Sequence, residues 1–393
     1  MAIKVKKRHG TWNKIVSPII TKLILKKKCN YTFDKCDIKP PFLVLANHTT
    51  DYDAFGMSKS FDTPIYFVMS DHVSSKPFVG KLIRHLVHPI PITKSTTDTE
   101  TVRNIFSVIK QGAPVALFPE GNKSFAGDMS QMKPSIAKLA KKLNVPVVIY
   151  TFEGGYLTYP RWSKIKRPGR YHGFVKRILS VEEIDALSVD ELFDVIKKEM
   201  YVNAYDIQER DMIKYSGEDL AVGIESMLYI CPKCKAISSL HGKGNDVICD
   251  KCDFKATYTE YGYLEGAPEK RLDKLDQMQK EYVKSFDYSI FSENDIITSD
   301  EGFDVKQKID KYKNKDLGEF KMNLYKNRFE LVSEKETIVI PFEIVNGYAI
   351  EAANGIQLSL TDGRVFRFKN LSPVSGLKYM NIYSAILGKE MKF

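Results

Sequence analysis

The amino-acid sequence predicts an α/β domain with a mostly parallel sheet, followed by a four-cysteine zinc ribbon and a small β-rich domain. Three observations predict this organisation. Apolar strand-like runs alternate with helical stripes in the first half of the chain, two Cys-x-x-Cys pairs follow, and the last part changes to short β runs with hairpin turns. A chain of 393 residues is long enough for two or three domains, because a domain usually holds roughly 100 to 200 residues.

The segment 1–30 is predicted to be a basic amphipathic helix. It carries nine cations and no acid before Cys29. Its apolar residues recur at helical spacing and therefore share one face: Trp12, Ile15, Val16, Ile19, Ile20, Leu23 and Ile24. We expect this helix to lie in the interface of an anionic membrane, and the alternative is a surface helix that packs on its own domain. Lys14 and Lys22 interrupt the apolar stretch, which argues against a secretory signal.

The α/β domain is expected over residues 31–215. The expected buried strands lie at 42–46, 65–69, 115–118 and 145–151, and the expected helices lie at 102–109, 136–143 and 189–200. Gly112 is a suitable residue to end the first of these helices. Strands that alternate with helices predict a largely parallel sheet.

Residues 47–53 follow the first predicted strand and read Asn-His-Thr-Thr-Asp-Tyr-Asp, with His48 and Asp53 in an HxxxxD arrangement. The carboxyl end of a strand is where α/β sheets expose functional side chains. A neutral imidazole can accept the proton of an attacking hydroxyl near pH 7, and a carboxylate behind it fixes the tautomer and stabilises the imidazolium. The spacing alone also fits a histidine held by structural hydrogen bonds.

Residues 118–124 read Phe-Pro-Glu-Gly-Asn-Lys-Ser and end another predicted strand. Together with residues 47–53, this block resembles the glycerolipid acyltransferase family that contains the 1-acyl-glycerol-3-phosphate acyltransferases, whose paired signatures are NHxxxxD and FPEGTRS. The two blocks occur in the family's order, and residues 145–148 follow as its fourth block. The resemblance covers about residues 10–215 and implies the fold of that family.

The resemblance implies an enzyme that moves a fatty acyl group from acyl-CoA or acyl-carrier protein to the hydroxyl of a lysophospholipid. The default acceptor is 1-acyl-glycerol-3-phosphate, in phospholipid biosynthesis. His48 is then the general base and Asp53 its carboxylate partner, while Asp51 stands at the wrong spacing. The expected location is cytoplasmic, peripheral on the inner face of the membrane. The alternative is a membrane lipid-binding adaptor with a degenerate acyltransferase domain, against which the intact pair of His48 and Asp53 argues.

The remaining site residues are also implied by the resemblance. Glu120 and Gly121 would shape the acceptor site. Lys94 and Lys123 stand where the family has arginine, and they would hold the acceptor phosphate. Because lysine is a point charge rather than a bidentate fork, these replacements leave the acceptor head group open.

Residues 225–265 are predicted to form a four-cysteine zinc ribbon. The ligands are two Cys-x-x-Cys pairs separated by fourteen residues, namely Cys231, Cys234, Cys249 and Cys252. Tetrahedral zinc with four thiolates has no open position, so the metal is expected to be structural and to replace the core that a short segment cannot build. The alternative is a set of unliganded thiols.

A zinc-ribbon nucleic-acid-binding protein is a further alternative, since the chain has a formal net charge of +10. Residues 228–265, however, carry five cations and five acids, whereas a surface that follows phosphates is clearly basic. The excess of positive charge lies in the segment 1–30. This distribution indicates anionic lipid as the partner and argues against nucleic acid.

Residues 266–315 are charged and weakly patterned, and we expect a linker with some helix. In residues 316–393 the pairs Asn354-Gly355 and Asp362-Gly363 are hairpin turns, and a final helix is expected over about 373–387. Several antiparallel strands closed by a C-terminal helix are similar to a pleckstrin-homology-like (PH-like) domain. No run of about 20 apolar residues is present, so no simple membrane-spanning helix is predicted.

Overall fold

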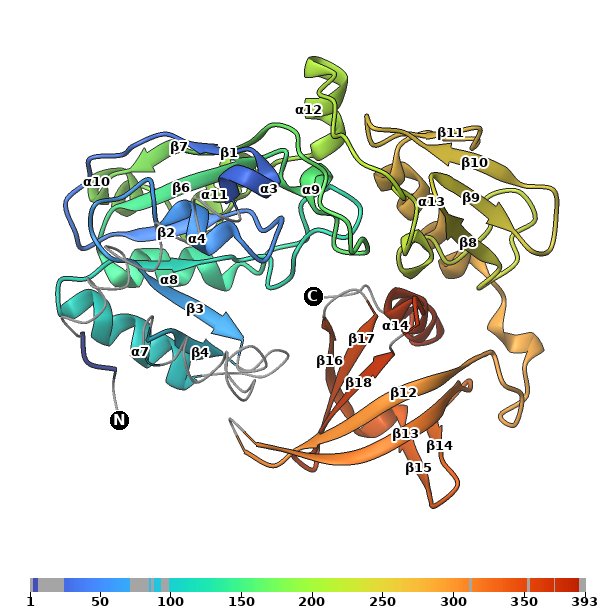
Figure 1. The fold of residues 1–393 in the computed structure, drawn as a ribbon. Coiled ribbons are helices and arrows are strands. Elements are labelled where there is room, and N and C mark those ends of the chain that lie inside the picture. Colours follow the sequence, from blue (N-terminus) through green and yellow to red (C-terminus); the bar gives the residue numbers. More distant parts are fainter. Residues whose placement is uncertain are drawn as a thin grey trace. The chain divides into compact units, whose positions relative to one another are not determined.

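The computed structural model describes residues 3–5, 25–70, 85, 88–92, 99–310, 313–351, 354–370 and 372–388. The described chain forms two compact units (Figure 1). Among the described residues, unit 1 runs to residue 217 without the short segment Arg161–Ile165. Unit 2 consists of that segment and the residues from 218 onward.

Unit 1 is built on a seven-stranded sheet with the strand order β1-β7-β6-β2-β5-β3-β4. Its strands are β1 (Tyr31–Phe33), β2 (Leu43–Ala46), β3 (Tyr66–Ser70), β4 (Ile90–Ile92), β5 (Val115–Leu117), β6 (Val147–Glu153) and β7 (Tyr171–Leu179). Neighbouring strands pair in parallel, except β6 and β7, which are antiparallel. The predicted α/β fold with a mostly parallel sheet is therefore confirmed.

Both faces of this sheet are buried, which explains the continuous apolar runs of its central strands. Along β2, Leu43 and Leu45 belong to one hydrophobic cluster, while Val44 and Ala46 belong to another. Apolar residues of α7, α8 and α11 complete the first cluster, and residues of α3 and α4 contribute to the second. The helices of unit 1 are α3 (Lys27–Cys29), α4 (Asp53–Met57), α7 (Thr99–Lys110), α8 (Ser135–Leu143), α9 (Gly155–Thr158), α10 (Val181–Ala186), α11 (Val189–Met200) and α12 (Ala204–Asp211).

Most of the predicted N-terminal helix, residues 6–24, lies outside the described residues, so its membrane role stays a prediction. After this stretch, Leu25 and Cys29 are buried in the core of unit 1. Before it, the backbone N–H of Ile3 donates to the side chain of Asn104 on α7 at 3.2 Å. No helix formed by the described residues is long and apolar enough to cross a membrane.

Unit 2 contains a small antiparallel sheet with the strand order β11-β10-β9-β8. Its elements are η3 (Ile224–Ser226), β8 (Leu240–Lys243), β9 (Asp246–Cys249), β10 (Lys255–Tyr258), β11 (Leu264–Glu265), α13 (Leu272–Ser285) and η4 (Tyr288–Ile290). The first Cys-x-x-Cys pair precedes β8, and the second lies where β9 turns into β10. The hairpin thus returns the chain so that the two pairs can meet.

The larger sheet of unit 2 has seven antiparallel strands in the order β15-β14-β13-β12-β18-β17-β16. Its elements are β12 (Thr298–Lys308), β13 (Asn314–Leu324), β14 (Arg328–Val332), β15 (Thr337–Pro341), η5 (Phe342–Ile344), β16 (Val345–Glu351), β17 (Gly355–Leu360), β18 (Val365–Asn370) and α14 (Gly376–Ile386). The structure has the expected antiparallel strands and C-terminal helix, while the likeness to a PH-like domain stays a prediction.

The predicted linker over residues 266–315 is wrong in its second half, because β12 lies there and belongs to the larger sheet. The helix expected in this stretch is α13. The sequence pattern hides β12 because Phe303 and Val305 are its buried residues, while its other positions are polar, charged or glycine. The β-rich region therefore begins at Thr298 rather than at 316.

The parts of unit 2 form one compact body rather than separate domains. The side-chain amide of Asn381 on α14 donates to the hydroxyl of Tyr229, in the chain before β8, at 2.6 Å. The ring of Trp162 packs edge-on against Tyr258 of β10, with the centroids 5.5 Å apart. The predicted α/β domain, residues 31–215, therefore includes one segment that belongs to unit 2, namely Arg161–Ile165.

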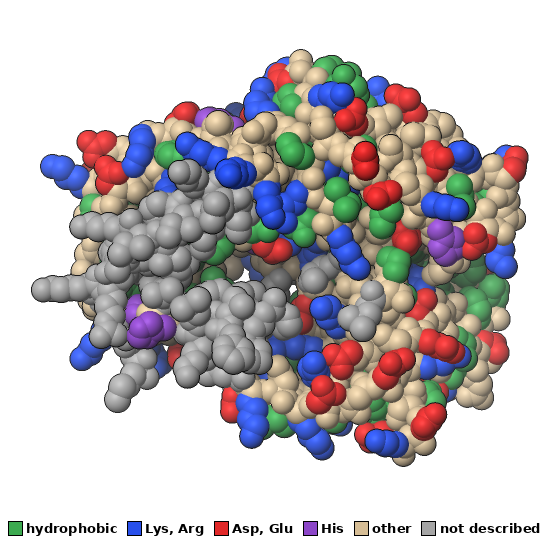
Figure 2. Space-filling model, in the orientation of Figure 1, with side chains coloured by type: hydrophobic (Ala, Val, Ile, Leu, Met, Phe, Trp, Pro, Cys, Tyr) green, Lys and Arg blue, Asp and Glu red, His purple; other side chains and the backbone are tan. Residues whose placement is uncertain are grey.

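Charges of both signs are distributed over the described surface. On the face drawn in Figure 2, basic and acidic side chains are interspersed. On the cysteine-containing part of unit 2, Lys233 lies 2.6 Å from Asp253, and Lys255 lies 2.8 Å from Asp246. Lys233 and Lys255 therefore both have carboxylate partners.

Candidate active site and metal centre

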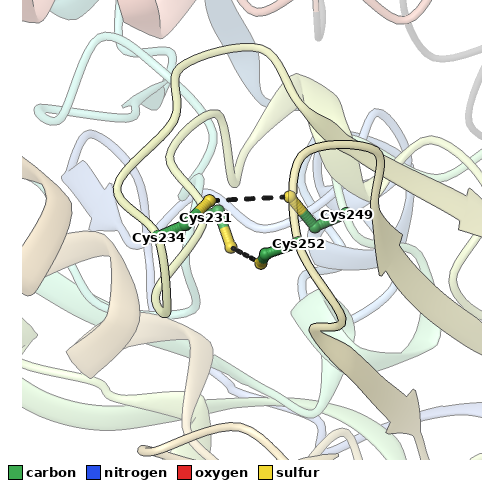
Figure 3. Close-up of side chains that lie close together, drawn as sticks. All are labelled: Cys231, Cys234, Cys249 and Cys252. Atoms are coloured by element: carbon green, nitrogen blue, oxygen red, sulfur yellow. Dashed lines mark hydrogen bonds between the residues drawn. The ribbon is translucent and has the colours of Figure 1, made fainter.

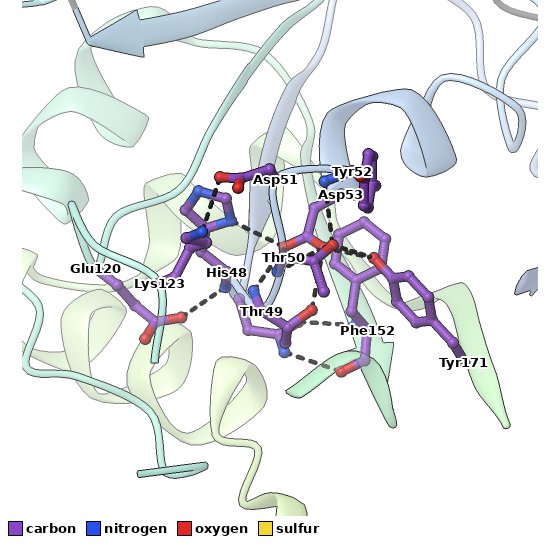
Figure 4. A network of polar contacts seen from close by, with 11 residues as sticks. His48, Thr49, Thr50, Asp51, Tyr52, Asp53, Glu120, Lys123, Phe152 and Tyr171 are labelled. Atoms are coloured by element: carbon purple, nitrogen blue, oxygen red, sulfur yellow. Dashed lines mark hydrogen bonds and ion pairs between the residues drawn. The ribbon is translucent and has the colours of Figure 1, made fainter. Parts of the chain in front are cut away.

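The segment 47–53 connects β2 to the start of α4, and it brings His48 and Asp53 together (Figure 4). The Nδ1 atom of His48 lies 2.8 Å from Oδ2 of Asp53. The carboxylate of Asp51 instead lies 2.8 Å from the ammonium of Lys123. The structure thus places the aspartate with the HxxxxD spacing behind the imidazole.

Asp53 is fully buried, and its carboxylate accepts hydrogen bonds from its own loop. The backbone N–H groups of Thr49 and Thr50 donate at 2.6 and 3.0 Å. The phenol of Tyr171 on β7 donates as well. Burial alone would raise the pKa of Asp53, but the hydrogen bonds that it accepts, above all from His48, lower that pKa below its ordinary value. The group therefore stays a carboxylate, which favours a proton on the ring nitrogen that faces it.

Asn47 fastens this loop to the neighbouring strand β6. Its side-chain amide donates to the carbonyl of Phe152 at 2.9 Å, and its Oδ1 accepts from the N–H of Phe152 at 2.7 Å. The side chain of Asn47 thereby makes two hydrogen bonds to the backbone of β6, as the backbone of a neighbouring strand residue would do. This two-point link determines where His48 leaves the sheet.

The second predicted motif, residues 118–124, reaches the first through Glu120. Its Oε1 accepts from the backbone N–H of His48 at 2.8 Å, and its Oε2 accepts from that of Ser130 at 2.8 Å. Burial raises the pKa of Glu120 to about 8, against the two backbone hydrogen bonds, which lower it. Gly121 turns the chain directly afterwards with a φ of +68°, a conformation that glycine adopts easily. Glu120 therefore links the two motif loops, which are residues 47–53 and residues 118–124.

The imidazole of His48 is held on one face and remains accessible. Its ring stacks on Phe118, with the centroids 4.2 Å and the planes 17° apart. The backbone carbonyl of His48 accepts from the N–H of Ser124 at 2.9 Å. The side chain of His48 keeps 23% of its surface exposed, while that of Asp53 has none. A reactant can thus reach the ring but not the carboxylate.

A cleft that is open to solvent lies beside His48. Its walls come from both motif loops, from the end of β6 and α9, and from the start of α12. They combine polar groups such as Glu120 with apolar side chains such as Met129, Tyr156 and Ile207. This lining suits a reactant that has both a polar and an apolar part.

The structure places one of the two lysines that were implied as phosphate ligands. Lys123 forms its ion pair with Asp51, and its side chain is 15% exposed. Lys94 lies outside the described residues. Lys123 therefore lies next to residues 47–53, where its ammonium forms an ion pair with the carboxylate of Asp51.

Three further residues complete the site beyond those singled out by spacing: Asn47, Phe118 and Tyr171. Asn47 and Phe118 are the first residues of the two motif blocks, so their positions in these blocks could have indicated that they belong to the site. Tyr171 lies 118 positions after Asp53, and no local pattern connects the two. Only the pairing of β7 with β6 and β1 brings its hydroxyl to the carboxylate.

The four predicted metal ligands come together in unit 2 (Figure 3). The Sγ atoms of Cys231, Cys234, Cys249 and Cys252 all lie within 4.8 Å of one another. The distances from Cys231 to Cys252 and from Cys234 to Cys249 are both 3.8 Å. A tetrahedral zinc ion with bonds of about 2.3 Å separates its sulfur ligands by about 3.8 Å, so these thiols fit such an ion.

Family comparison identifies the class of domain in unit 1. Residues 27–152 match the family model described as Acyltransferase. This range includes both motif loops, with His48, Asp53 and Glu120. The chain therefore carries a domain of the Acyltransferase family.

Individual relatives are more distant. The chain is 28% identical over 148 residues to a probable 1-acyl-sn-glycerol-3-phosphate acyltransferase of Mycoplasma genitalium, which covers 35% of this chain and 53% of that protein. It is 26% identical over 132 residues to the 1-acyl-sn-glycerol-3-phosphate acyltransferase of Pseudomonas aeruginosa, with 33% and 50% covered. The chain thus spans about half the length of these curated relatives. Among solved structures, the 1-acyl-sn-glycerophosphate acyltransferase of Thermotoga maritima is 20% identical, with a TM-score of 0.40 over 54% of this chain and 81% of that one.

Proposed function

We propose that the protein transfers a fatty acyl group from a thioester donor to the hydroxyl of a lysophospholipid. One observation carries this proposal. The buried carboxylate of Asp53 stands behind the accessible imidazole of His48, beside a cleft and inside a domain of the Acyltransferase family. A histidine with a carboxylate behind it can activate a hydroxyl, and here the substrate supplies the hydroxyl that a serine supplies in hydrolases.

His48 acts as the general base in this proposal. Its Nδ1 faces Asp53, which leaves Nε2 to take the proton of the acceptor hydroxyl. The acceptor oxygen then forms a bond to the thioester carbonyl carbon, and the carbon–sulfur bond breaks. The imidazolium returns its proton to the departing thiolate, so no covalent enzyme intermediate is needed. Asp53 stabilises the imidazolium while it exists.

We further propose 1-acyl-glycerol-3-phosphate as the acceptor and acyl-CoA or acyl-carrier protein as the donor, in phospholipid biosynthesis. The names of the relatives support this acceptor. Glu120 and Gly121 would shape the acceptor site, and Lys123, together with Lys94, would meet the phosphate. Lys123 would exchange Asp51 for the phosphate when the acceptor binds.

We also propose that the protein is peripheral on the inner face of an anionic membrane, through the basic segment 1–30. The four cysteines would hold one structural zinc ion. Four thiolates leave no position for a substrate, and the metal would stabilise a region whose small sheet cannot form a conventional core.

A substrate screen with the full-length protein tests this function. Labelled acyl-CoA and acyl-carrier-protein donors are combined with lysophosphatidic acid, glycerol 3-phosphate and several lysophospholipids, and His48→Ala is the matched control. We expect transfer to lysophosphatidic acid by the wild type and nearly none by the control. If folded, zinc-containing protein transferred nothing from either donor, the lipid-binding adaptor would become the better explanation.

A further inference from the structure

Unit 1 contains a second basic feature beside the motif loop 47–53, formed by Lys166, Tyr52 and Tyr159. The ammonium of Lys166 lies 5.5 Å from the ring centroid of Tyr52 and 5.0 Å from that of Tyr159. The two rings stack with centroids 6.2 Å apart and planes at 27°. All three residues are partly buried. Because Tyr52 directly precedes Asp53, this cluster contacts the loop that holds the catalytic imidazole of the proposed reaction.

The backbone next to Lys166 is anchored to α9, a helix at the edge of the cleft. The N–H of Arg167 donates to the carbonyl of Thr158 at 2.7 Å. At its other end, α9 packs closely on the motif loop, since a Cβ added to Gly155 would lie 2.1 Å from the hydroxyl oxygen of Thr49. Lys166 is therefore positioned by the same elements that form the cleft.

The charge of Lys166 is not neutralised within the described part of the chain. No carboxylate among the described residues lies within ion-pair distance of its ammonium. Burial tends to lower the pKa of Lys166, but the hydrogen bond and electrostatic influence of Tyr52, followed by those of Tyr159, raise it overall. An ammonium held over aromatic faces keeps its charge and its free N–H donors. Lys123, in contrast, already has Asp51 as its partner.

We propose that Lys166, held by Tyr52 and Tyr159, binds a phosphate group of one of the two reactants and so orients that reactant toward His48. The inference rests on the proposed acyl transfer and adds a residue that the family motifs do not include. Lysine binds phosphate as a point charge, and the neighbouring phenol hydroxyls can donate further hydrogen bonds. The phosphate belongs either to the acceptor glycerol phosphate or to the CoA or phosphopantetheine part of the donor.

The test compares three variants of the full-length protein. Lys166→Met removes the charge but keeps the length of the side chain, Lys166→Arg restores the charge, and Lys164→Met is the control at an exposed lysine two positions earlier. We expect Lys166→Met to raise KM for the reactant whose phosphate is bound by about 10-fold, with kcat within about twofold, because a hydrogen bond to a charged group contributes about that much to binding. Lys166→Arg should recover most of the loss, and Lys164→Met should match the wild type.

Phosphate-free reactants distinguish the two sources. If the acceptor phosphate is bound, the effect of Lys166→Met disappears when monoacylglycerol replaces lysophosphatidic acid. If the donor phosphate is bound, the effect disappears with an acyl thioester of N-acetylcysteamine. Unchanged KM values for both reactants, or an equal loss of kcat with charged and phosphate-free substrates, would overturn the proposal.

Binding measurements separate this inference from the proposed function. Calorimetric titrations of lysophosphatidic acid and of CoA are made on the wild type, Lys166→Met and Lys164→Met. If the wild type transfers no acyl group, the proposed function fails, but weaker binding of one ligand by Lys166→Met alone still supports the phosphate site. Equal binding of both ligands by all three proteins overturns it, whatever the turnover.

Discussion

The two units differ in how their strands meet solvent, and the difference shows where sequence patterns are informative. In unit 1, every residue of β2 is buried, and the strand pairs in parallel on both sides. In unit 2, β12 has Phe303 and Val305 as its buried residues along eleven positions. A strand covered on both faces must be apolar throughout, whereas an antiparallel strand with one solvated face needs apolar residues on its covered face alone. The loops with the candidate chemistry follow strands of the first kind.

The buried polar groups of the two units also differ in arrangement. In unit 1 they converge on the carboxylate behind His48. In unit 2 the buried ammonium of Lys378 on α14 lies 2.6 Å from Asp300 of β12 and 2.8 Å from the hydroxyl of Ser238 near the cysteine cluster. Such a buried pair joins separate segments, and losing one partner is costly. We therefore expect changes in the first network to act on turnover and changes in unit 2 to act on folding.

The largest effect is expected for His48→Ala. Loss of a general base typically lowers the rate by about 100- to 10,000-fold, while the partly exposed ring contributes little to the core. The measurement is kcat for acyl transfer together with the thermal unfolding midpoint. The control is His172→Ala on β7, whose imidazole contacts the hydroxyl of Thr32 at 2.8 Å and the exposed carboxylate of Asp34 at 3.4 Å, away from the cleft residues. A comparable loss of activity in both variants would contradict the role of His48 as the general base.

The two aspartates of residues 47–53 are expected to differ in their effect on turnover. Asp53→Asn should lower kcat by about 100-fold or more, because an amide no longer fixes the tautomer or stabilises the imidazolium. Asp51→Asn should change kcat by less than about threefold, since the carboxylate that it removes is 67% exposed and pairs with Lys123 rather than with His48. Both variants are compared under identical conditions. The reverse order of the two effects would contradict the pairing seen in the structure.

In unit 2, Cys249→Ser should reduce the bound metal well below about one ion per chain, because structural zinc needs all four thiolates. Hydrogen exchange should become faster in residues 228–258, while β2 and β6 keep their protection. Metal analysis and exchange mass spectrometry measure the two effects, and Cys36→Ser, a half-buried thiol of unit 1, is the control. Wild-type protein purified without metal but with full protection of this region would refute the zinc prediction.

The smallest effect is expected for Glu120, and it depends on pH. Burial raises the pKa of this group from its ordinary 4.5 to about 8, so the folded state holds a proton that the unfolded state has lost. The contribution of Glu120 to stability is therefore fully present below pH 4.5 and is lost as pH rises to about 8. Glu120→Gln should abolish this trend in the unfolding midpoint. It should also lower stability by about 1 to 3 kcal/mol, since its amide N–H would face a backbone N–H. An unchanged pH trend in the variant would assign the titration to another group.

Much of the site could be predicted because its parts are close in sequence. One loop connects His48 to both Asp51 and Asp53, and the resemblance to the NHxxxxD signature implied that Asp53 is the partner of the ring. The two Cys-x-x-Cys pairs likewise imply a cluster, because each pair occupies one turn. The strands at 42–46 and 115–118 were detectable from their continuous apolar runs.

The α/β class and the set of four cysteines could therefore be predicted from local periodicity and spacing, and the pairing of His48 with Asp53 from the resemblance of residues 47–53 to the NHxxxxD signature. Two contacts could not be predicted in this way: Glu120 accepts a hydrogen bond from the backbone of His48, 72 positions away, and Tyr171 donates to Asp53. The assignment of Trp162 to unit 2 could not be predicted either. These contacts depend on strand order and on how distant segments pack. The residues adjacent in sequence do not indicate these contacts, because the partner of a buried polar group depends on which distant segments the fold brings together.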